Sequence, residues 1–247
     1  MLTTIPAAVR SAVARDPAAP LLTWYDDASG DRTELSGATM DNWVAKTANM
    51  LVDGLGTEPG DTVALRLPAH WQTAAILLGA SAAGLIVDLG TEPRPATVLF
   101  TDPPHASVAA SGTAGDSFVT GLLPLAMPVR EVPAGFADYV TEVRVHGDHF
   151  QPGMPVSADD PALLGPGVTG ATPLRHGAVC DAARRRAADL GISAGDRVLL
   201  STRAHPDPMD WLLAPLVAGA STVLCANLDG AAVTARAESE KVTVTLV

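Results

Sequence analysis

The feature that most constrains the fold of this 247-residue sequence is an internal repeat in which residue i resembles residue i+135 without a gap. The two copies span residues 55–87 and 190–222. The identical positions are Leu55, Gly56, Gly60, Asp61, Val63 and Leu65, matched by Leu190, Gly191, Gly195, Asp196, Val198 and Leu200. An ungapped match over about thirty positions indicates two copies of one structural unit.

Hydrophobic periodicity gives each copy a strand, a helix and a second strand. In the first copy these are Asp61–Leu67, Trp71–Ala83 and Leu85–Leu89. Short joints between strand, helix and strand indicate a parallel crossover unit. The sequence therefore predicts an α/β protein of two side-by-side α/β subdomains with mainly parallel sheets. We expect residues 1–160, including a Pro/Gly-rich connection, to form the first subdomain and residues 161–247 the second.

Other elements follow from caps and apolar spacing. Ser36 is a suitable N-cap for a helix that ends near Gly54, and Asp207 followed by Pro208 favours the start of another. A further helix is expected at Gly177–Leu190. The remaining predicted strands are Thr97–Thr101, Ser117–Leu123, Tyr139–Val145, Ala162–Leu164, Arg197–Ser201, Thr222–Ala226 and Val242–Val247.

Composition excludes several classes of protein. With 47% apolar and 17% charged residues the chain is too apolar for a disordered protein. A net charge of −11 argues against nucleic acid and anionic membranes as partners, because both require basic surface. The longest apolar stretch, Ala74–Val87, is too short to span a bilayer, and Met1–Arg10 lacks a targeting pattern, so we expect a cytoplasmic protein. Cys180 and Cys225 are then expected to be reduced thiols.

The order of these motifs resembles the N-terminal region of the adenylate-forming superfamily, the AMP-dependent synthetases and ligases that include acyl-CoA synthetases. The first copy is similar through Gly60-Asp61-Thr62-Val63-Ala64-Leu65, Leu67-Pro68 and Ala83-Gly84. The second copy is similar through Gly195-Asp196-Arg197-Val198-Leu199, His205 and Leu216-Val217-Ala218-Gly219-Ala220. The resemblance covers residues 19–247.

One departure from the family lies in the phosphate loop. Family members wrap the β- and γ-phosphates of ATP in a Ser/Thr/Gly-rich loop that ends in Pro-Lys-Gly. The corresponding stretch here, residues 165–176, has no lysine and is shortened. We expect it to be a degenerate phosphate loop that binds ATP or AMP weakly, and we expect no cofactor. Its candidate nucleotide-binding residues are Gly165, Gly167, Thr169, Gly170, Arg175 and His176.

A second departure is that the chain stops before the family's adenine-binding motifs, magnesium ligand and lysine-bearing lid. Its two lysines, Lys46 and Lys241, match no catalytic position. The resemblance thus implies no catalytic residue here and a truncated pseudoenzyme, inactive alone, that serves as a binding or interaction module. If the chain is active, the resemblance implies an acid–thiol or acyl-adenylate-forming ligase.

His205 aligns with a family position that lines the carboxylate or acyl pocket, so it is a candidate to orient a small acid. Its repeat partner His70 favours instead a structural residue after a strand. The His146-Gly147-Asp148-His149 run has metal-binding residue types, but a solvated loop is the simpler interpretation and no metal is expected. Arg184-Arg185-Arg186 is most simply the solvated face of a helix.

Two further hypotheses stay open. In one, self-association or a partner chain completes an adenylating enzyme, because the terminal strand Val242–Val247 would otherwise leave an uncovered sheet edge. In the other, the chain is a nucleotide-binding or oxidoreductase-like domain, because Gly165–Gly170 fits the G-x-G-x-x-G pattern. Arg203 would then be placed to meet a 2′-phosphate.

Overall fold

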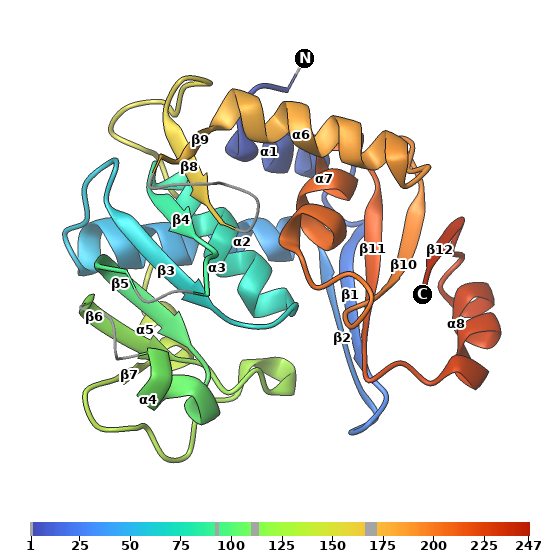
Figure 1. The fold of residues 1–247 in the computed structure, drawn as a ribbon, viewed down its shortest axis with the longest axis horizontal. Coiled ribbons are helices and arrows are strands. Elements are labelled where there is room, and N and C mark those ends of the chain that lie inside the picture. Colours follow the sequence, from blue (N-terminus) through green and yellow to red (C-terminus); the bar gives the residue numbers. More distant parts are fainter. Residues whose placement is uncertain (1, 92–93, 110–113, 166–171) are drawn as a thin grey trace. The chain divides into compact units, whose positions relative to one another are not determined.

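The computed structural model describes residues 2–91, 94–109, 114–165 and 172–247. Contacts divide the chain into two compact units (Figure 1). Unit 1 comprises Met1–Asp41, Pro68–Ala74 and Cys180–Val247, and unit 2 comprises Asn42–Leu67 and Ala75–Val179. Each unit contains one mainly parallel sheet, so the fold is α/β, as the sequence predicts.

Unit 1 is built on a five-stranded sheet in the order β12-β10-β11-β1-β2 (Figure 1). Its strands are β1 (Pro20–Asp26), β2 (Asp31–Ser36), β10 (Arg197–Ser201), β11 (Ser221–Ala226) and β12 (Val244–Leu246). Its helices are α1 (Ile5–Arg15), α7 (Ala214–Ala218), preceded by a π-helical turn at Met209–Leu213, and α8 (Val233–Ser239). β1 runs parallel to β11. The N-terminal segment therefore shares a sheet with the second repeat copy, which differs from the division at residue 160 expected from sequence.

Unit 2 is built on a seven-stranded sheet in the order β7-β6-β5-β3-β4-β8-β9. Its strands are β3 (Thr62–Arg66), β4 (Ile86–Asp88), β5 (Ala96–Thr101), β6 (Ala114–Val119), β7 (Ala137–Asp138), β8 (Pro161–Leu164) and β9 (Leu174–Arg175). Its short helices are α4 (Ala106–Ala109) and α5 (Tyr139–Val143). All pairings are parallel except that of β9 with β8.

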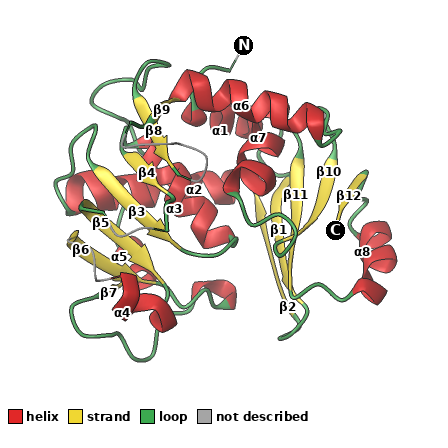
Figure 2. Cartoon of the chain, viewed as in Figure 1, coloured by secondary structure: helices red, strands yellow, loops and turns green. Residues whose placement is uncertain are grey.

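The described part of the chain also contains three longer helices (Figure 2). They are α2 (Gly37–Asn49), which continues into a π-helical turn at Met50–Gly54, α3 (Trp71–Ala82) and α6 (His176–Asp189). The predicted cap of α2 is present, because Ser36 Oγ accepts a hydrogen bond from the Thr39 N–H at 3.2 Å. Among the described residues, none of the helices combines the length and apolarity that a membrane span needs.

The glycine turns before β3 and β10 carry the same hydrogen bonds. Gly60 N–H donates to the Gly84 carbonyl and Gly195 N–H donates to the Gly219 carbonyl, each at 3.0 Å. The register also keeps the offset of 135, since Thr62 pairs with Ile86 and Arg197 with Ser221. All four glycines have positive φ values, from 77° to 94°, which side chains with a Cβ rarely adopt.

The prediction of a strand at Tyr139–Val145 is wrong, because Tyr139–Val143 forms helix α5. Asp138 caps the helix, because its Oδ1 accepts from the Thr141 N–H at 2.7 Å. Tyr139, Val140 and Val143 are fully buried, and this spacing places them on one helical face. Burial of that face, together with the Asp138 cap, outweighs the strand preference of Tyr and Val.

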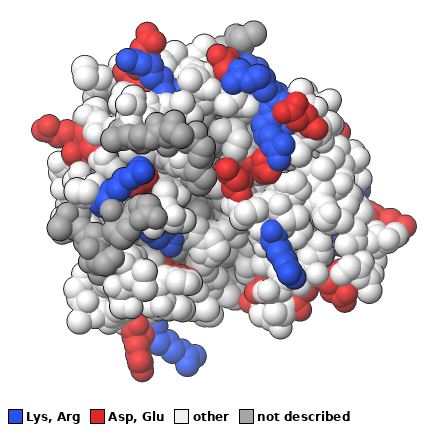
Figure 3. All heavy atoms as spheres, in the orientation of Figure 1, with Lys and Arg blue, Asp and Glu red and all other residues white. Residues whose placement is uncertain are grey.

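Acidic and basic side chains stand beside one another on the face drawn in Figure 3. Ion pairs also form between residues of one unit. In unit 1, Arg236 binds Asp27 at 2.6 Å and Arg186 binds Asp210 at 2.6 Å. In unit 2, Arg66 binds Asp88 at 2.7 Å. The positive charge of these arginines is thus largely matched by nearby carboxylates.

Candidate functional site

His205 follows β10 in unit 1 and is held by a carboxylate. Its Nδ1 lies 2.9 Å from Oδ2 of Asp210, which stands in the π-helical turn before α7. Asp210 is in turn held by Arg186 of α6, whose Nε donates to Oδ1 at 2.6 Å and whose Nη2 donates to Oδ2 at 2.8 Å. The three side chains, which we call the His205 cluster, form a chain of charge-assisted hydrogen bonds.

The ionisation state of Asp210 determines which residue donates the hydrogen bond between Asp210 and His205. The hydrogen bonds from Arg186 lower the pKa of Asp210, burial opposes this shift, and the bond to His205 adds to it. Asp210 is therefore ionised at neutral pH and accepts the Nδ1–H of His205. The tautomer that results leaves the lone pair on Nε2, to which no other described residue forms a hydrogen bond. The His205 side chain is 17% exposed, so the ring is partly open to solvent.

His70 occupies the matching repeat position but has a different environment. It is 1% exposed, its Nδ1 accepts from the Gln72 N–H at 3.1 Å, and its ring meets Trp24 edge-on with centroids 4.5 Å apart. Burial lowers the pKa of His70 to about 3, so the ring is neutral. His70 belongs to the core of unit 1, whereas His205 is partly open to solvent.

The structure describes only part of the stretch predicted to be a degenerate phosphate loop, because Gly167, Thr169 and Gly170 lie outside the described residues. Gly165 follows β8 and packs on Leu89. A Cβ added at this position would lie 3.2 Å from the Cβ of Leu89. Arg175 pairs with Pro161, at the opposite end of β8. The structure therefore does not bring Arg175 to Gly165, although both belong to the same sequence motif.

Arg175 and His176 each make contacts that tie them to the segment before β8. The Arg175 guanidinium donates to the Asp159 carbonyl, and the His176 N–H donates to the Asp160 carbonyl at 3.0 Å. The His176 side chain is buried, and burial lowers its pKa to about 4 although Asp160 opposes this shift. A phosphate-binding role for these two residues stays a prediction.

The His146–His149 loop is held from α2 through its backbone. Lys46 Nζ donates to the His146 carbonyl at 2.6 Å, and Asn49 donates to the Gly147 and His149 carbonyls at 2.8 and 2.9 Å. Among the residues that the structure describes, no three His, Cys, Asp or Glu side chains gather in an arrangement that would hold a metal. Lys46 is thus used to fix a loop.

Sequence reasoning missed a charged group in unit 2 formed by Arg66, Asp88 and Arg94. Arg66 ends β3 and Asp88 ends β4, and the two side chains form an ion pair at 2.7 Å. A signal was present in the sequence, because each residue interrupts an otherwise apolar strand, and a buried charge requires a partner.

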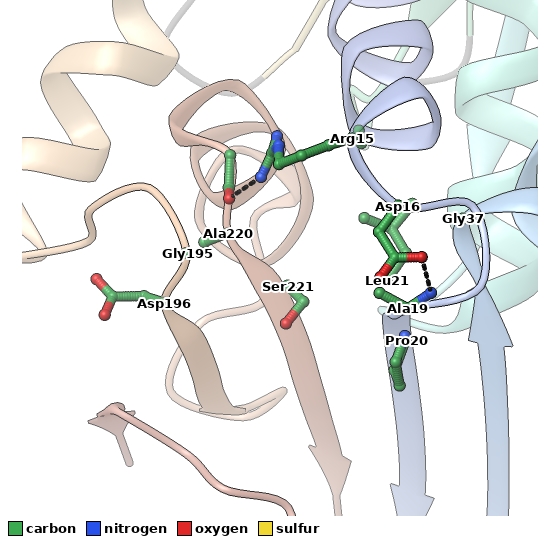
Figure 4. Close-up of a pocket in the computed structure, with 12 residues that line it drawn as sticks. Arg15, Asp16, Ala19, Pro20, Leu21, Gly37, Gly195, Asp196, Ala220 and Ser221 are labelled. Atoms are coloured by element: carbon green, nitrogen blue, oxygen red, sulfur yellow. Dashed lines mark hydrogen bonds between the residues drawn. The ribbon is translucent and has the colours of Figure 1, made fainter.

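Figure 4 shows a pocket of about 180 Å³ at the amino ends of β1, β10 and β11. Its charged groups already have partners. Arg15 donates to the Gly219 carbonyl, and the Asp16 carboxylate accepts from the Ala18 and Ala19 N–H groups. Asp196 accepts from the Ser193 N–H at 2.6 Å and from Thr243 at 2.7 Å. These bonds stabilise the turns around the pocket, so we assign it a structural role.

A protein from Mycobacterium tuberculosis (strain ATCC 25618 / H37Rv), described as a TIGR03089 family protein, is 42% identical over 247 residues. The match covers 98% of this chain and 97% of the relative. The chain belongs to the TIGR03089 family. Residues 9–88 of this TIGR03089 protein also match the model of the AMP-binding enzyme family.

Solved structures show that the TIGR03089 protein has the fold of the N-terminal region of acyl-CoA synthetases. An acyl-CoA synthetase from Brucella canis matches with a TM-score of 0.73 at 20% identity, over 96% of this chain and 46% of that one. The N-terminal domain of FACL13 from Mycobacterium tuberculosis matches with a TM-score of 0.64 at 17% identity, over 99% of this chain and 62% of that one. This chain spans about half the length of the acyl-CoA synthetase it matches.

Proposed function

We propose that this TIGR03089 family protein binds a small acid without activating it, as a catalytically inactive relative of adenylate-forming enzymes. The observation that carries this proposal is the placement of its two lysines. Lys46 donates to a loop carbonyl in unit 2, and Lys241 lies in the turn between α8 and β12 of unit 1. Neither is in the phosphate-loop segment 165–176.

The physical reason is the charge that develops during adenylation. Nucleotide activation by carboxylate attack on the α-phosphate concentrates negative charge, and fixed cations usually supply the largest catalytic term. The loop segment offers a single arginine as its permanent cation, and Arg175 stands at the far end of β8 from Gly165. This separation supports binding without chemistry for the polypeptide described here.

The His205 cluster supports the choice of a small acid as ligand. With Nδ1 fixed by Asp210, Nε2 can accept a hydrogen bond from a protonated acid. When His205 itself is protonated, Nε2 can instead donate to a carboxylate. The bidentate bond from Arg186 to Asp210 holds this geometry before a ligand arrives, which lowers the entropic cost of binding.

Binding without turnover is tested with the purified chain. Calorimetric titration with a panel of carboxylic acids should find at least one ligand, and its affinity should fall about tenfold or more in His205→Gln. His149→Gln, which changes an exposed histidine of unit 2, is the matched control. Incubation of the same acids with ATP and Mg²⁺ should yield no AMP. AMP formation, or equal affinity in wild type and His205→Gln, would contradict the proposal.

A second candidate function is favoured by strand β12. It pairs with β10 and lies at one edge of the unit 1 sheet, so no second strand pairs with it within the described part of the chain. We propose as the alternative that a partner chain, or a second copy, covers this edge and completes an adenylating enzyme. Light scattering and affinity purification test it, and a lone monomer without AMP-forming activity in cell extract rejects it.

The matched turns support a further proposal, that the cores of the two units are copies of one ancestral element. The offset of 135 holds for the Gly60 and Gly195 hydrogen bonds and for the strand registers. It also holds for the Leu85 and Ala220 N–H groups, which donate to Ala80 and Pro215 at 3.0 and 2.9 Å.

A further inference from the structure

Arg203 is an exposed arginine of unit 1 that forms no hydrogen bond or ion pair with any residue of the described ranges. Other arginines of the same unit differ, since Arg186 binds Asp210 and Arg236 binds Asp27. A guanidinium has five N–H donors. No described protein group occupies those of Arg203, so they are available to a ligand.

Arg203 lies in a short turn that follows β10 directly. Backbone hydrogen bonds fix this turn, because the Thr202 N–H donates to the Cys225 carbonyl at 3.0 Å and the His205 N–H donates to the Ser201 carbonyl at 2.9 Å. The first bond ties the turn to β11, and the second closes it. Arg203 is thus held in the same turn as the histidine of the His205 cluster.

The chain keeps Arg203 close to His205. Residues two positions apart have Cα atoms no more than about 7 Å apart, even in an extended chain. Asp210 lies 2.9 Å from Nδ1 of His205, and within the described part of the chain Nε2 has no partner. One turn therefore carries a guanidinium and a ring nitrogen that are both without a protein partner, on residues separated by the length of a small molecule.

The acidic residues next in the chain have other partners. The Asp207 carboxylate accepts from the Met209 N–H at 2.8 Å, and Asp210 is held by Arg186 and His205. Neither carboxylate forms an ion pair with Arg203. They fix the following turn and the histidine ring, and they leave the Arg203 guanidinium unoccupied.

The strand order places this turn where ligands bind in open α/β sheets. β11 pairs with one side of β10 and β12 with the other, and the three strands are parallel. The chain passes from β10 to β11 and then to the far side of β10, so the strand order reverses at β10. Ligands bind outside the carboxyl ends of the strands at such a point. Ser201 is the last residue of β10, and Arg203 follows two residues later.

We propose that Arg203 binds a second oxyanion of the small acid, so that the preferred ligand carries an anionic group at each end. One acid group meets Nε2 of His205, and the other accepts hydrogen bonds from Arg203. The planar fork of a guanidinium matches two oxygens of either a carboxylate or a phosphate. Both groups offer the same chemistry, and the test below has an arm for each.

This inference rests on the proposed function for the acid group at His205 and adds a second group to the ligand. The two ideas fail separately. Loss of acid binding in His205→Gln measures the proposed function, whereas the extra affinity gained from a second charge measures the role of Arg203. Binding of monoacids without any gain from a second charge would leave the proposed function intact and overturn this inference, and absence of acid binding would overturn both.

The test is calorimetric titration of the full chain with succinate, 3-phosphonopropionate and monomethyl succinate. Monomethyl succinate keeps the carbon chain of succinate but has a single charge. The ligands with two anionic groups should bind about fivefold more tightly than the ester, which is the gain that an exposed charge pair can give. This preference should shrink at high salt, because exposed charges are screened.

Two variants assign the preference to a residue. Arg203→Gln should bind succinate and its monomethyl ester equally, with the affinity for the ester unchanged. Arg10→Gln removes the same charge from an exposed position of α1 and should keep the preference. Since Arg203 has no partner in the described part of the chain, thermal unfolding of Arg203→Gln should match that of wild type.

Each outcome decides the proposal. A preference that persists in Arg203→Gln overturns the assignment, as does an equal loss in Arg10→Gln, which would indicate long-range attraction. Equal affinity of the wild type for succinate and its ester also overturns it. With the preference lost only in Arg203→Gln, tighter binding of succinate supports a carboxylate as the second group, and tighter binding of 3-phosphonopropionate supports a phosphate.

Discussion

Glu240 and Arg197 bind each other through both side chain and backbone. The Glu240 carboxylate accepts from Arg197 Nη2, and the Glu240 backbone carbonyl accepts from Arg197 Nε at 2.7 Å. The same carboxylate accepts from the Tyr25 hydroxyl at 2.6 Å and from Arg32 at 2.9 Å. These bonds join the segment after α8 to β10, β1 and β2, so the C-terminal part of the described chain is firmly held in unit 1.

This network predicts acid sensitivity. Burial alone would raise the pKa of Glu240, but hydrogen bonds from Tyr25, Arg197 and Arg32 outweigh it and lower the pKa to about 2. The stabilisation is therefore complete above the ordinary glutamate pKa of 4.5 and is lost as the pH falls toward 2. Glu240→Gln should cost about 2 kcal/mol at neutral pH and reduce this dependence, as measured by urea unfolding. Glu238→Gln in the neighbouring helix α8 changes an exposed carboxylate and should change neither.

The His205 cluster predicts a fixed histidine tautomer. Long-range ¹H–¹⁵N NMR at neutral pH should find the proton of His205 on Nδ1, because Asp210 accepts it. Asp210→Asn should release that preference and lower stability by about 2 kcal/mol, since Arg186 loses its buried partner. Glu238→Gln, an exposed change in α8, serves as the control. An unchanged tautomer in Asp210→Asn would show that Asp210 does not orient the ring.

His70 predicts a second pH effect at higher pH. Burial lowers its pKa to about 3, so the unfolded chain binds a proton below about pH 6.5 and the folded chain does not. As the pH falls from about 6.5 toward 3, the free energy of unfolding should therefore decrease by as much as about 1.4 kcal/mol per pH unit. His70→Asn keeps an acceptor for the Gln72 N–H and should flatten the dependence, whereas His149→Asn should leave it intact. Urea unfolding, monitored by tryptophan fluorescence at about pH 7 and about pH 5, measures this difference in stability.

The matched glycine turns predict that the same substitution lowers the stability of the protein by a similar amount at each turn. Gly60 and Gly195 have φ values of 94° and 87°, and a Cβ at either would meet no atom within 4 Å. Gly60→Ala and Gly195→Ala should therefore each cost about 1–2 kcal/mol from backbone strain alone. Gly153→Ala has equal space without a positive φ and should be close to neutral. Thermal unfolding of the three variants measures these losses. If only one of Gly60→Ala and Gly195→Ala lowered the melting temperature, the two turns would not be equivalent.

Local patterns predicted the elements that their own residues determine. The Gly60-Asp61 and Gly195-Asp196 turns lead into β3 and β10, and Ser36 caps α2, as expected. Asp207 also accepts from the Met209 N–H at 2.8 Å, near the expected helix start. In each case a glycine or a cap acts within a few residues, so the signal is present in a short stretch of sequence.

Contacts between distant segments were not predictable in the same way. The pairing of β1 with β11 joins residues about two hundred positions apart, and periodicity carries no information on such partners. The interpretation of Arg184-Arg185-Arg186 as a solvated face was incomplete, because Arg186 binds Asp210 and Arg184 donates to the Leu2 carbonyl at 2.7 Å. The His205 cluster depends on this contact between α6 and the turn before α7.

The central claim is that this polypeptide binds without activating a carboxylate, and ATP–pyrophosphate exchange measures it most directly. The purified chain is incubated with ATP, Mg²⁺, labelled pyrophosphate and a panel of short, long and aromatic acids, beside a complete acyl-CoA synthetase as positive control. We predict that label enters ATP only with the control enzyme. Acid-dependent exchange by the pure chain, above that of a heat-denatured sample, would contradict the account.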